Sequence, residues 1–236
     1  MKDNSMIKYI PTIPQQNQIA LTTELREYGV LRFSKDKKDI GWMYHITVND
    51  EWRHYYVIYI GAVDANYMPL SEHYGNETAL HIRIDSGCIT GMVFGDKSCE
   101  CKQQLTQALN LIRKKGVGFI VHIPAQDGRG MGIDFKLLTL RKQYMTGFDT
   151  VRTARVCAGG TKLIDRRTYH GAIACLKFLG VRESHSLNVV TNNPDKISSF
   201  TSNGFLDLRE TRVIVKPTYL TRKHLEAKRR YLGHLI

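Results

Sequence analysis

The sequence contains no long apolar segment. Nowhere do 18 apolar residues follow one another without a charge, and residues 1–20 lack the continuous apolar stretch of a secretory signal. A hydrophobic content of 42% over 236 residues is ordinary for a protein with a packed core. We therefore expect a globular cytoplasmic protein that does not insert into a membrane.

Acidic residues are few relative to basic ones. The chain has 22 Asp and Glu against 34 Lys and Arg, which gives a formal net charge of +12. This excess favours an anionic partner, and a nucleic acid, a membrane surface and a phosphorylated small molecule all satisfy it. The basic residues are dispersed in short clusters such as 113–115, 166–167 and 228–230, without a polybasic tail. Charge alone does not choose among the three kinds of partner.

Cysteine is distributed too unevenly for a disulfide framework. The five cysteines are an odd number, and Cys88, Cys99 and Cys101 fall within fourteen residues as C-x10-C-x-C. Three thiolates can hold Zn²⁺ at about 2.3 Å and leave one tetrahedral position open, where zinc lowers the pKa of water towards about 7. A fourth protein ligand would make the site structural instead. Cys157 and Cys175 lack ligand spacing and are expected to pack in the core.

The order of the expected elements predicts an α/β (α+β) fold with a mixed β-sheet core and flanking helices. Residues 1–22 contain two prolines and a polar Gln-Gln-Asn-Gln run, and we expect them to form an N-terminal arm. Residues 23–236 show no internal repeat or linker and are expected to form a single domain. Periodicity predicts strands at 56–61, 81–85, 118–123 and 187–191, and helices at 104–115, 133–145 and 168–179.

A glycine-rich turn, residues 126–132, connects a predicted strand to a predicted helix. Its sequence is Gln-Asp-Gly-Arg-Gly-Met-Gly, and Arg129 supplies the planar cation that is best suited to bidentate phosphate binding. Backbone amides at the start of a helix add to such a site. Strand-to-helix turns also need glycine for purely conformational reasons, so the turn by itself leaves both interpretations open.

In this order, the motifs resemble those of the GTP cyclohydrolase II family. The family pattern of Cys, ten residues and Cys-x-Cys is followed here by Gln-acid-Gly-Arg-x-x-Gly. Further segments that match are Asp165-Arg166-Arg167-x-Tyr169, Leu179-Gly-Val181, Thr191-Asn-Asn-Pro-x-Lys196 and the C-terminal segment from His224 to Ile236. Together they cover residues 81–236, about two thirds of the chain.

The resemblance implies a zinc-dependent hydrolase that opens the imidazole ring of GTP at C8 and releases diphosphate. Cys88, Cys99 and Cys101 would hold the zinc, and Mg²⁺ would accompany the nucleotide phosphates. Arg167 would attack the α-phosphate, with Asp165 as its acid/base partner. The implied nucleotide contacts are Arg83, Gln104, Asp127, Arg129, Thr150, Thr191 and Lys196. The resemblance also implies a homodimer.

The sequence departs from the family pattern close to these residues. The family has a tyrosine eight residues after the last glycine of the turn, where this chain has Leu140, which cannot transfer a proton. Tyr144 follows one helical turn later and is a candidate to reach the same face. The family run Arg-x-His-Ser-Glu-Cys is here changed to Asp85 at the histidine position and Gly87 at the glutamate position. These changes indicate a divergent member.

Several alternatives stay open at this point. The product can be the diaminopyrimidine ribosyl phosphate, with formate released, or the formamido compound that precedes it, which Leu140 slightly favours. A related enzyme could act on another purine nucleotide. A basic nucleic-acid-binding module with a structural zinc would also explain the charge, but no nucleic-acid-binding signature is present, and its aromatic residues are not interleaved with basic ones.

Overall fold

A seven-stranded mixed sheet runs through the computed structural model, which describes residues 21–74, 79–160 and 164–235. The strands are β1 (Thr23–Arg32), β2 (Ile40–Val48), β3 (His54–Ile60), β4 (Leu80–Ser86), β5 (Gly118–Ile123), β6 (Leu187–Val190) and β7 (Leu208–Thr211). Their order across the sheet is β1-β2-β3-β5-β4-β6-β7.

The sheet has an antiparallel half and a parallel half. β1, β2, β3 and β5 pair antiparallel, whereas β5, β4, β6 and β7 pair parallel. The carboxyl ends of β4, β5 and β6 therefore meet at one edge, which is where parallel α/β sheets place their ligand sites. This arrangement confirms the predicted mixed α/β fold.

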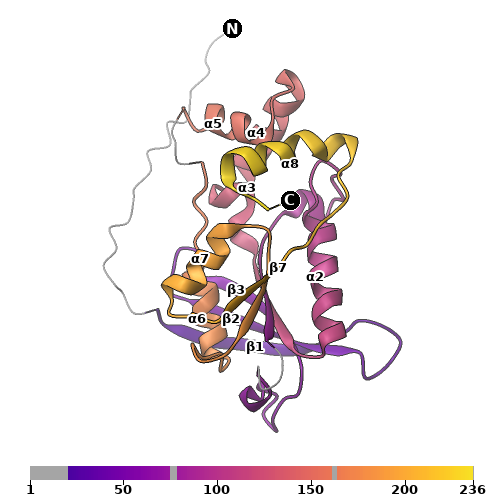
Figure 1. Cartoon of the computed structure of the whole chain (residues 1–236), viewed down its shortest axis with the longest axis vertical. Helices are drawn as coiled ribbons and strands as arrows, with labels where there is room; N and C mark the ends of the chain where they lie inside the picture. The colour runs from indigo at the N-terminus through magenta and orange to yellow at the C-terminus, as the bar shows by residue number, and fades with distance from the viewer. Residues whose placement is uncertain (1–20, 75–78, 161–163, 236) are drawn as a thin grey trace.

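Helices cover both faces and this edge of the sheet (Figure 1). Their bounds are α1 (Ile89–Met92), α2 (Cys101–Lys115), α3 (Asp127–Gly130), α4 (Gly132–Thr146), α5 (Thr150–Cys157), α6 (His170–Phe178), α7 (Pro194–Ser202) and α8 (Tyr219–Leu232). Short 3-10 turns occupy Ser71–His73 and Pro124–Gln126. α6 and α7 lie on one face and α2 on the other, while α4, α5 and α8 gather above the edge.

The largest core lies between the sheet and α6. Alternate residues of the strands, including Tyr44, Val57 and Phe119, pack against Ile173 and Leu176 of α6. On the opposite face, Ile112 of α2 packs on Ile60 and Ile120. Cys175 is fully buried in the first core, as predicted, whereas Cys157 at the end of α5 is only half-buried.

Most predicted elements are present, with shifted ends. β5 has the predicted bounds, and α4 extends the predicted helix by one residue at each end. α2 begins three residues before the predicted helix, because the first turn contains Cys101 and polar residues that carry no apolar periodicity. Most of the predicted arm, residues 1–20, lies outside the described residues. Within the described part, no helix combines the length and hydropathy needed to cross a bilayer.

Candidate active site

A pocket opens at the carboxyl edge of the parallel strands. The chain leaves β4 towards Cys88, β5 towards Asp127 and β6 towards Thr191, and all three residues line the pocket. Residues of α4, α5 and α8 line its other side. The pocket thus gathers segments that lie more than a hundred residues apart in the sequence.

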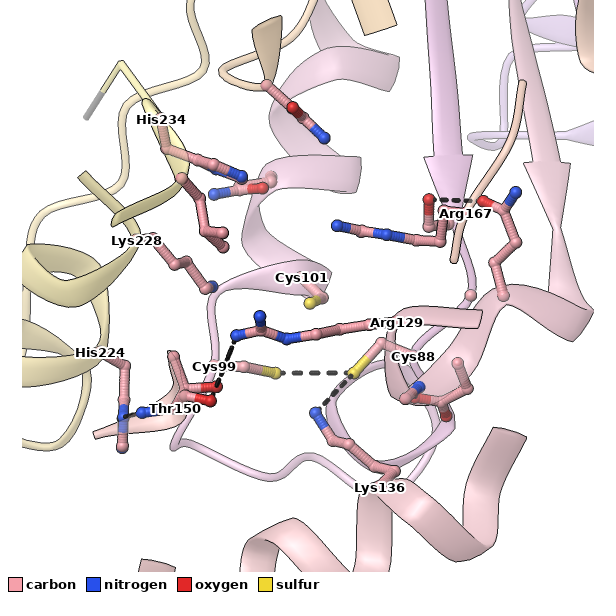
Figure 2. A pocket seen from close by; sticks show the side chains of 18 of the residues that line it. Cys88, Cys99, Cys101, Arg129, Lys136, Thr150, Arg167, His224, Lys228 and His234 are labelled. Carbon is pink, nitrogen blue, oxygen red and sulfur yellow. Dashed lines mark hydrogen bonds between the residues drawn. The ribbon is translucent and has the colours of Figure 1, made fainter. Parts of the chain in front are cut away.

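The three predicted metal ligands come together in this pocket. The sulfur atoms of Cys88, Cys99 and Cys101 lie within 4.8 Å of one another and point towards a common centre (Figure 2). The sulfurs of Cys88 and Cys99 are 3.8 Å apart. Two sulfurs bound tetrahedrally to one zinc at about 2.3 Å would be separated by about 3.8 Å. The cluster therefore fits a zinc ion, and no fourth His, Cys, Asp or Glu joins it among the residues the structure describes.

The thiols also affect one another's protonation. A hydrogen bond with Cys101, followed by one with Cys99, holds the pKa of the Cys88 thiol far below its ordinary value. The hydrogen bond to Cys88 in turn raises the pKa of Cys101. A thiolate is therefore already favoured in the cluster, and metal binding needs thiolates.

Lys136 of α4 faces the sulfur cluster. Its Nζ atom lies 3.8 Å from Sγ of Cys88 (Figure 2). Burial lowers the pKa of this ammonium, but the three thiols and Asp127 outweigh burial and raise it above its ordinary value. The protonated form of Lys136 is therefore favoured beside the sulfur cluster. Lys136 could not be predicted as a site residue, because a single lysine within a helix carries no sequence pattern.

The glycine-rich turn has a strained backbone. Gly128 and Arg129 have φ values of 59° and 61°, in the left-handed region, which is uncommon for a residue other than glycine. The turn is anchored by Asp127, whose carboxylate accepts hydrogen bonds from the backbone amides of Gly128, at 2.7 Å, and Ile89, at 2.9 Å. Asp127, predicted to contact the nucleotide, thus also ties the turn to the helix that follows Cys88.

Arg129 reaches across the pocket to α5. Its Nη2 donates to the carbonyl and hydroxyl oxygens of Thr150, each at 3.3 Å, while its buried Nη1 has no partner within the described residues. Burial lowers the pKa of Arg129 to about 10. Thr150 in turn donates its backbone N–H to Nδ1 of His224 at 3.1 Å. The two predicted substrate residues Arg129 and Thr150 are therefore neighbours, and His224 supports them.

Asp165 and Arg167, the predicted catalytic pair, form a bidentate ion pair. Nε of Arg167 donates to Oδ1 of Asp165 at 2.8 Å, and Nη2 donates to Oδ2. Burial lowers the pKa of Arg167, but Tyr169 and Asp165 outweigh burial and raise it above its ordinary value. Arg167 lines the pocket. Asp165 does not line it and contacts it only through Arg167.

Two further predicted basic residues, Arg83 and Lys196, line the pocket. Arg83 donates from Nη2 to Asp85 at 3.2 Å, and its buried Nε has no partner within the described residues. Asp85 also contacts Nδ1 of His122 at 2.9 Å. Lys196 donates to the carbonyl oxygen of Ile84 at 2.7 Å, and burial, then Arg83 and Arg167, lower its pKa to about 7. This concentration of positive charge favours an anionic ligand.

The remaining predicted residues also line the pocket. Gln104 projects from the first turns of α2, and buried Thr191 follows β6, where its hydroxyl oxygen accepts the backbone N–H of Asn193 at 3.1 Å. All predicted site residues except Asp165 therefore line the pocket. Asp165 contacts Arg167, which lines it.

The C-terminal segment supplies pocket residues that were not predicted individually from the sequence. Lys228 and His234 line the pocket together with His224 (Figure 2). Burial, then Lys228 and Arg167, lower the pKa of His234 to about 3, so its imidazole is neutral. The backbone N–H of Leu235 donates to Asn192 at 3.0 Å and fixes this segment. The family-like stretch 224–236 was the available signal, but the residue roles were not apparent from it.

Leu140 lines the pocket, and Tyr144 does not. The Tyr144 side chain is 93% exposed on the outer side of α4. Four residues advance a helix by about 400°, so Tyr144 is rotated by about 40° from Leu140, away from the pocket. The suggestion that Tyr144 replaces the missing tyrosine is therefore wrong in this structure.

Comparison with known proteins identifies the family to which the pocket residues correspond. Residues 42–206 match the family model of GTP cyclohydrolase II. The chloroplastic monofunctional riboflavin biosynthesis protein RIBA 3 of Arabidopsis thaliana is 35% identical over 161 residues, 68% of this chain and 30% of that protein. A GTP cyclohydrolase-2 of Archaeoglobus fulgidus is 37% identical over 66% of this chain and 39% of its own length.

A shorter relative is covered more completely. The GTP cyclohydrolase-2 of Picrophilus torridus is 32% identical over 155 residues, 66% of this chain and 77% of that protein. The chain thus matches about a third of the first two relatives and most of the third. Since the family model covers well over half of the chain, the protein belongs to the GTP cyclohydrolase II family.

Proposed function

We propose that this protein is a GTP cyclohydrolase II-type hydrolase, which opens the imidazole ring of GTP at C8 and releases diphosphate. The observation that supports this most directly is that one pocket contains both a cluster of three cysteine sulfurs and the basic side chains of Arg83, Arg129, Arg167 and Lys196. A purine triphosphate presents an electrophilic ring carbon and a polyanion, and so needs both features in one place.

Cys88, Cys99 and Cys101 would hold Zn²⁺. Zinc with an open coordination position supplies Lewis acidity that makes water nucleophilic near neutral pH. Lys136 offsets the negative charge of the thiolates from 3.8 Å away. The ring carbon of the nucleotide would therefore face the sulfur cluster, beside the end of β4.

The phosphates would bind to Arg129 in the glycine-rich turn and to Arg83 and Lys196. Arg129 and Arg83 each have a buried N–H without a partner in the described residues, and such groups are costly unless a ligand satisfies them. Lys196 adds a nearby ammonium. Mg²⁺ bound to the phosphates would neutralise their remaining charge.

Arg167 and Asp165 would carry out the phosphoryl step. A nitrogen of Arg167 would attack the α-phosphorus, the bond from that phosphorus to the oxygen that bridges it to the β-phosphorus would break, and diphosphate would leave. Water would later cleave the resulting P–N bond, which frees the ribosyl phosphate and restores Arg167. The guanidinium must first lose a proton, because a protonated nitrogen has no free electron pair. In this proposal Asp165, which accepts hydrogen bonds from Nε and Nη2, would take it.

The proposal also covers the product, the oligomeric state and the location of the protein. Ring opening gives a formamidopyrimidine or, after loss of formate, a diaminopyrimidine ribosyl phosphate, which in the relatives' named pathway leads to riboflavin. Another purine nucleotide is the alternative substrate. A homodimer fits the family. A cytoplasmic location fits the five free thiols. A nucleic-acid module with structural zinc is not favoured, because the cluster in the described residues has three ligands.

Incubation of zinc-loaded protein with GTP tests the proposal. Mass spectrometry identifies the nucleotide product, and separate assays quantify formate and diphosphate. We expect GTP consumption with one diphosphate per GTP. Consumption of another purine nucleotide but not of GTP would favour the alternative substrate, and no reaction with either would refute the proposal.

A further inference from the structure

The register of the sheet places a histidine beside an acidic residue of the pocket. His122 of β5 lies opposite Asp85 of β4 in the parallel pair and opposite Tyr56 of β3 in the antiparallel pair. Directly opposed residues project from the same face of a sheet. It is the face on which α2 packs, because Ile120, two residues before His122, contacts Ile112. The pairing of the strands itself therefore makes the imidazole and the carboxylate neighbours.

Asp85 makes one contact through each carboxylate oxygen. Oδ1 accepts from Nη2 of Arg83 at 3.2 Å, and Oδ2 lies 2.9 Å from Nδ1 of His122. A carboxylate only accepts hydrogen bonds, so Nδ1 of His122 carries the proton of this contact. Arg83 and Asp85 are both buried and line the pocket, whereas His122 is partly exposed and does not line it. His122 therefore acts on the pocket through Asp85.

The neighbouring backbone leaves no room for an acidic side chain at residue 87. A β-carbon on Gly87 would lie 2.7 Å from the carbonyl oxygen of Pro124 and 3.0 Å from its Cα. This approach is fixed, because the backbone N–H of Gly87 donates to the carbonyl oxygen of Ile123 at 2.9 Å. Residues 85 and 87 are also the positions at which the sequence departs from the family run. The pairing of an acid at 85 with a histidine at 122 thus follows from this chain's own sequence.

We propose that His122 is a positioning residue, which holds Asp85 so that Asp85 orients Arg83 towards the anionic part of the substrate. Nη1 of Arg83 donates to the carbonyl oxygen of Val190 at 3.4 Å, and Nη2 donates to Asp85. The buried Nε has no partner within the described residues and is left for a ligand. That this ligand is a phosphate rests on the proposed function.

The loss of the imidazole would change what Arg83 offers to a ligand. Without the N–H of His122, Oδ2 of the buried carboxylate would lack its donor, which is unfavourable. Asp85 would then compete for the remaining N–H groups of Arg83, including Nε. Removal of His122 should therefore weaken the binding of a polyanion, although His122 does not touch it.

Paired substitutions of His122 test this role. Asparagine keeps an N–H donor close to the position of Nδ1, whereas leucine has none. In calorimetry with inorganic triphosphate, the dissociation constant should rise about tenfold or more in His122→Leu and stay within about threefold of the wild type in His122→Asn. In an Asp85→Asn background, His122→Leu should have no further effect, because the two residues act as a unit. The control is His54→Leu, the same change at an exposed histidine of β3, which should bind like the wild type.

A second measurement needs no ligand. NMR of the ring nitrogens shows which one carries the proton, and neutral His122 should be the Nδ1–H tautomer. The proposal is wrong if the Nε2–H tautomer is found, if the wild type does not bind triphosphate, or if His122→Leu binds it like the wild type. Equal losses in His122→Asn and His122→Leu would also contradict it, because they would indicate a packing role. The expected pattern in a protein that does not consume GTP would support this inference and refute the proposed function.

Discussion

A β-carbon placed on Gly91 would lie 2.5 Å from Sγ of Cys99 and 3.4 Å from Sγ of Cys88. Gly91 lies in α1 and is buried, and its φ is not in the left-handed region. Alanine would therefore suit the backbone and has the better helix propensity. The sulfur cluster, rather than the backbone conformation, requires glycine at this position.

Gly91→Ala should weaken zinc binding. The added methyl group must displace the sulfur of Cys99, and changes to groups that position metal ligands typically lower metal affinity by about 10- to 100-fold. Competition with a chelator, followed by elemental analysis, measures the dissociation constant. Gly29→Ala is the matched control, because a β-carbon there meets nothing within 4 Å. Wild-type affinity in Gly91→Ala would contradict a metal site built on these sulfurs.

Arg167→Lys should abolish diphosphate release while leaving the zinc content intact. Lysine keeps the charge but cannot reproduce the two parallel hydrogen bonds to Asp165. We expect a fall of about 10²-fold or more in diphosphate formation. Arg182→Lys, at an exposed position away from the pocket, should behave as wild type. Unchanged diphosphate production in Arg167→Lys would show that the residue does not act on the phosphate.

Lys196 should make nucleotide binding depend on pH. Burial lowers its pKa to about 7, and a bound triphosphate favours the charged form. Affinity should therefore fall as pH rises above about 7, by up to about tenfold per unit. Calorimetry with an α,β-methylene analogue of GTP measures this. Lys196→Arg, charged throughout, should lose that part of the dependence, and identical profiles would exclude Lys196 as its source.

The same shift predicts a stability trend in the free protein. Between about pH 7 and 10, the unfolded chain carries a proton on Lys196 that the folded chain has released. The unfolded state binds more protons, so this residue makes the free energy of unfolding rise with pH in that window. Lys196→Met should remove the rise, and urea unfolding at several pH values would detect it.

Local patterns predicted the fold and the cysteine cluster, whereas the family resemblance supplied most of the other site residues. The short apolar run of β5 and the spacing of the three thiols depend on neighbouring residues, and both the strand and the gathering of the three sulfurs were confirmed. His224 and Lys136 could not be found in this way, because their roles arise from contacts with Thr150 and Cys88 over 74 and 48 residues of chain. Such contacts follow from the packing of α4, α5 and α8 over the sheet edge.

The outward direction of Tyr144 shows a different limit. Helical periodicity allowed it to share a face with Leu140, since residues four apart are neighbours. The boundary of the pocket falls between them, and its position depends on how α4 packs against its surroundings. Periodicity gives the relative angle of two side chains but not the direction in which the pocket lies.

Leu140 provides the last prediction, because it lines the pocket where the family has a tyrosine. Acid-base assistance from one side chain is typically worth about 10² to 10⁴ in rate. Without that hydroxyl, the loss of formate should be slowed more than ring opening, and the formamido compound should accumulate. Leu140→Tyr should raise the formate yield per GTP, measured by mass spectrometry and a formate assay. Tyr144→Phe is the control, and its 93% exposed ring predicts an unchanged product. If the wild type instead releases one formate per GTP, other groups complete the deformylation and the leucine does not determine the product.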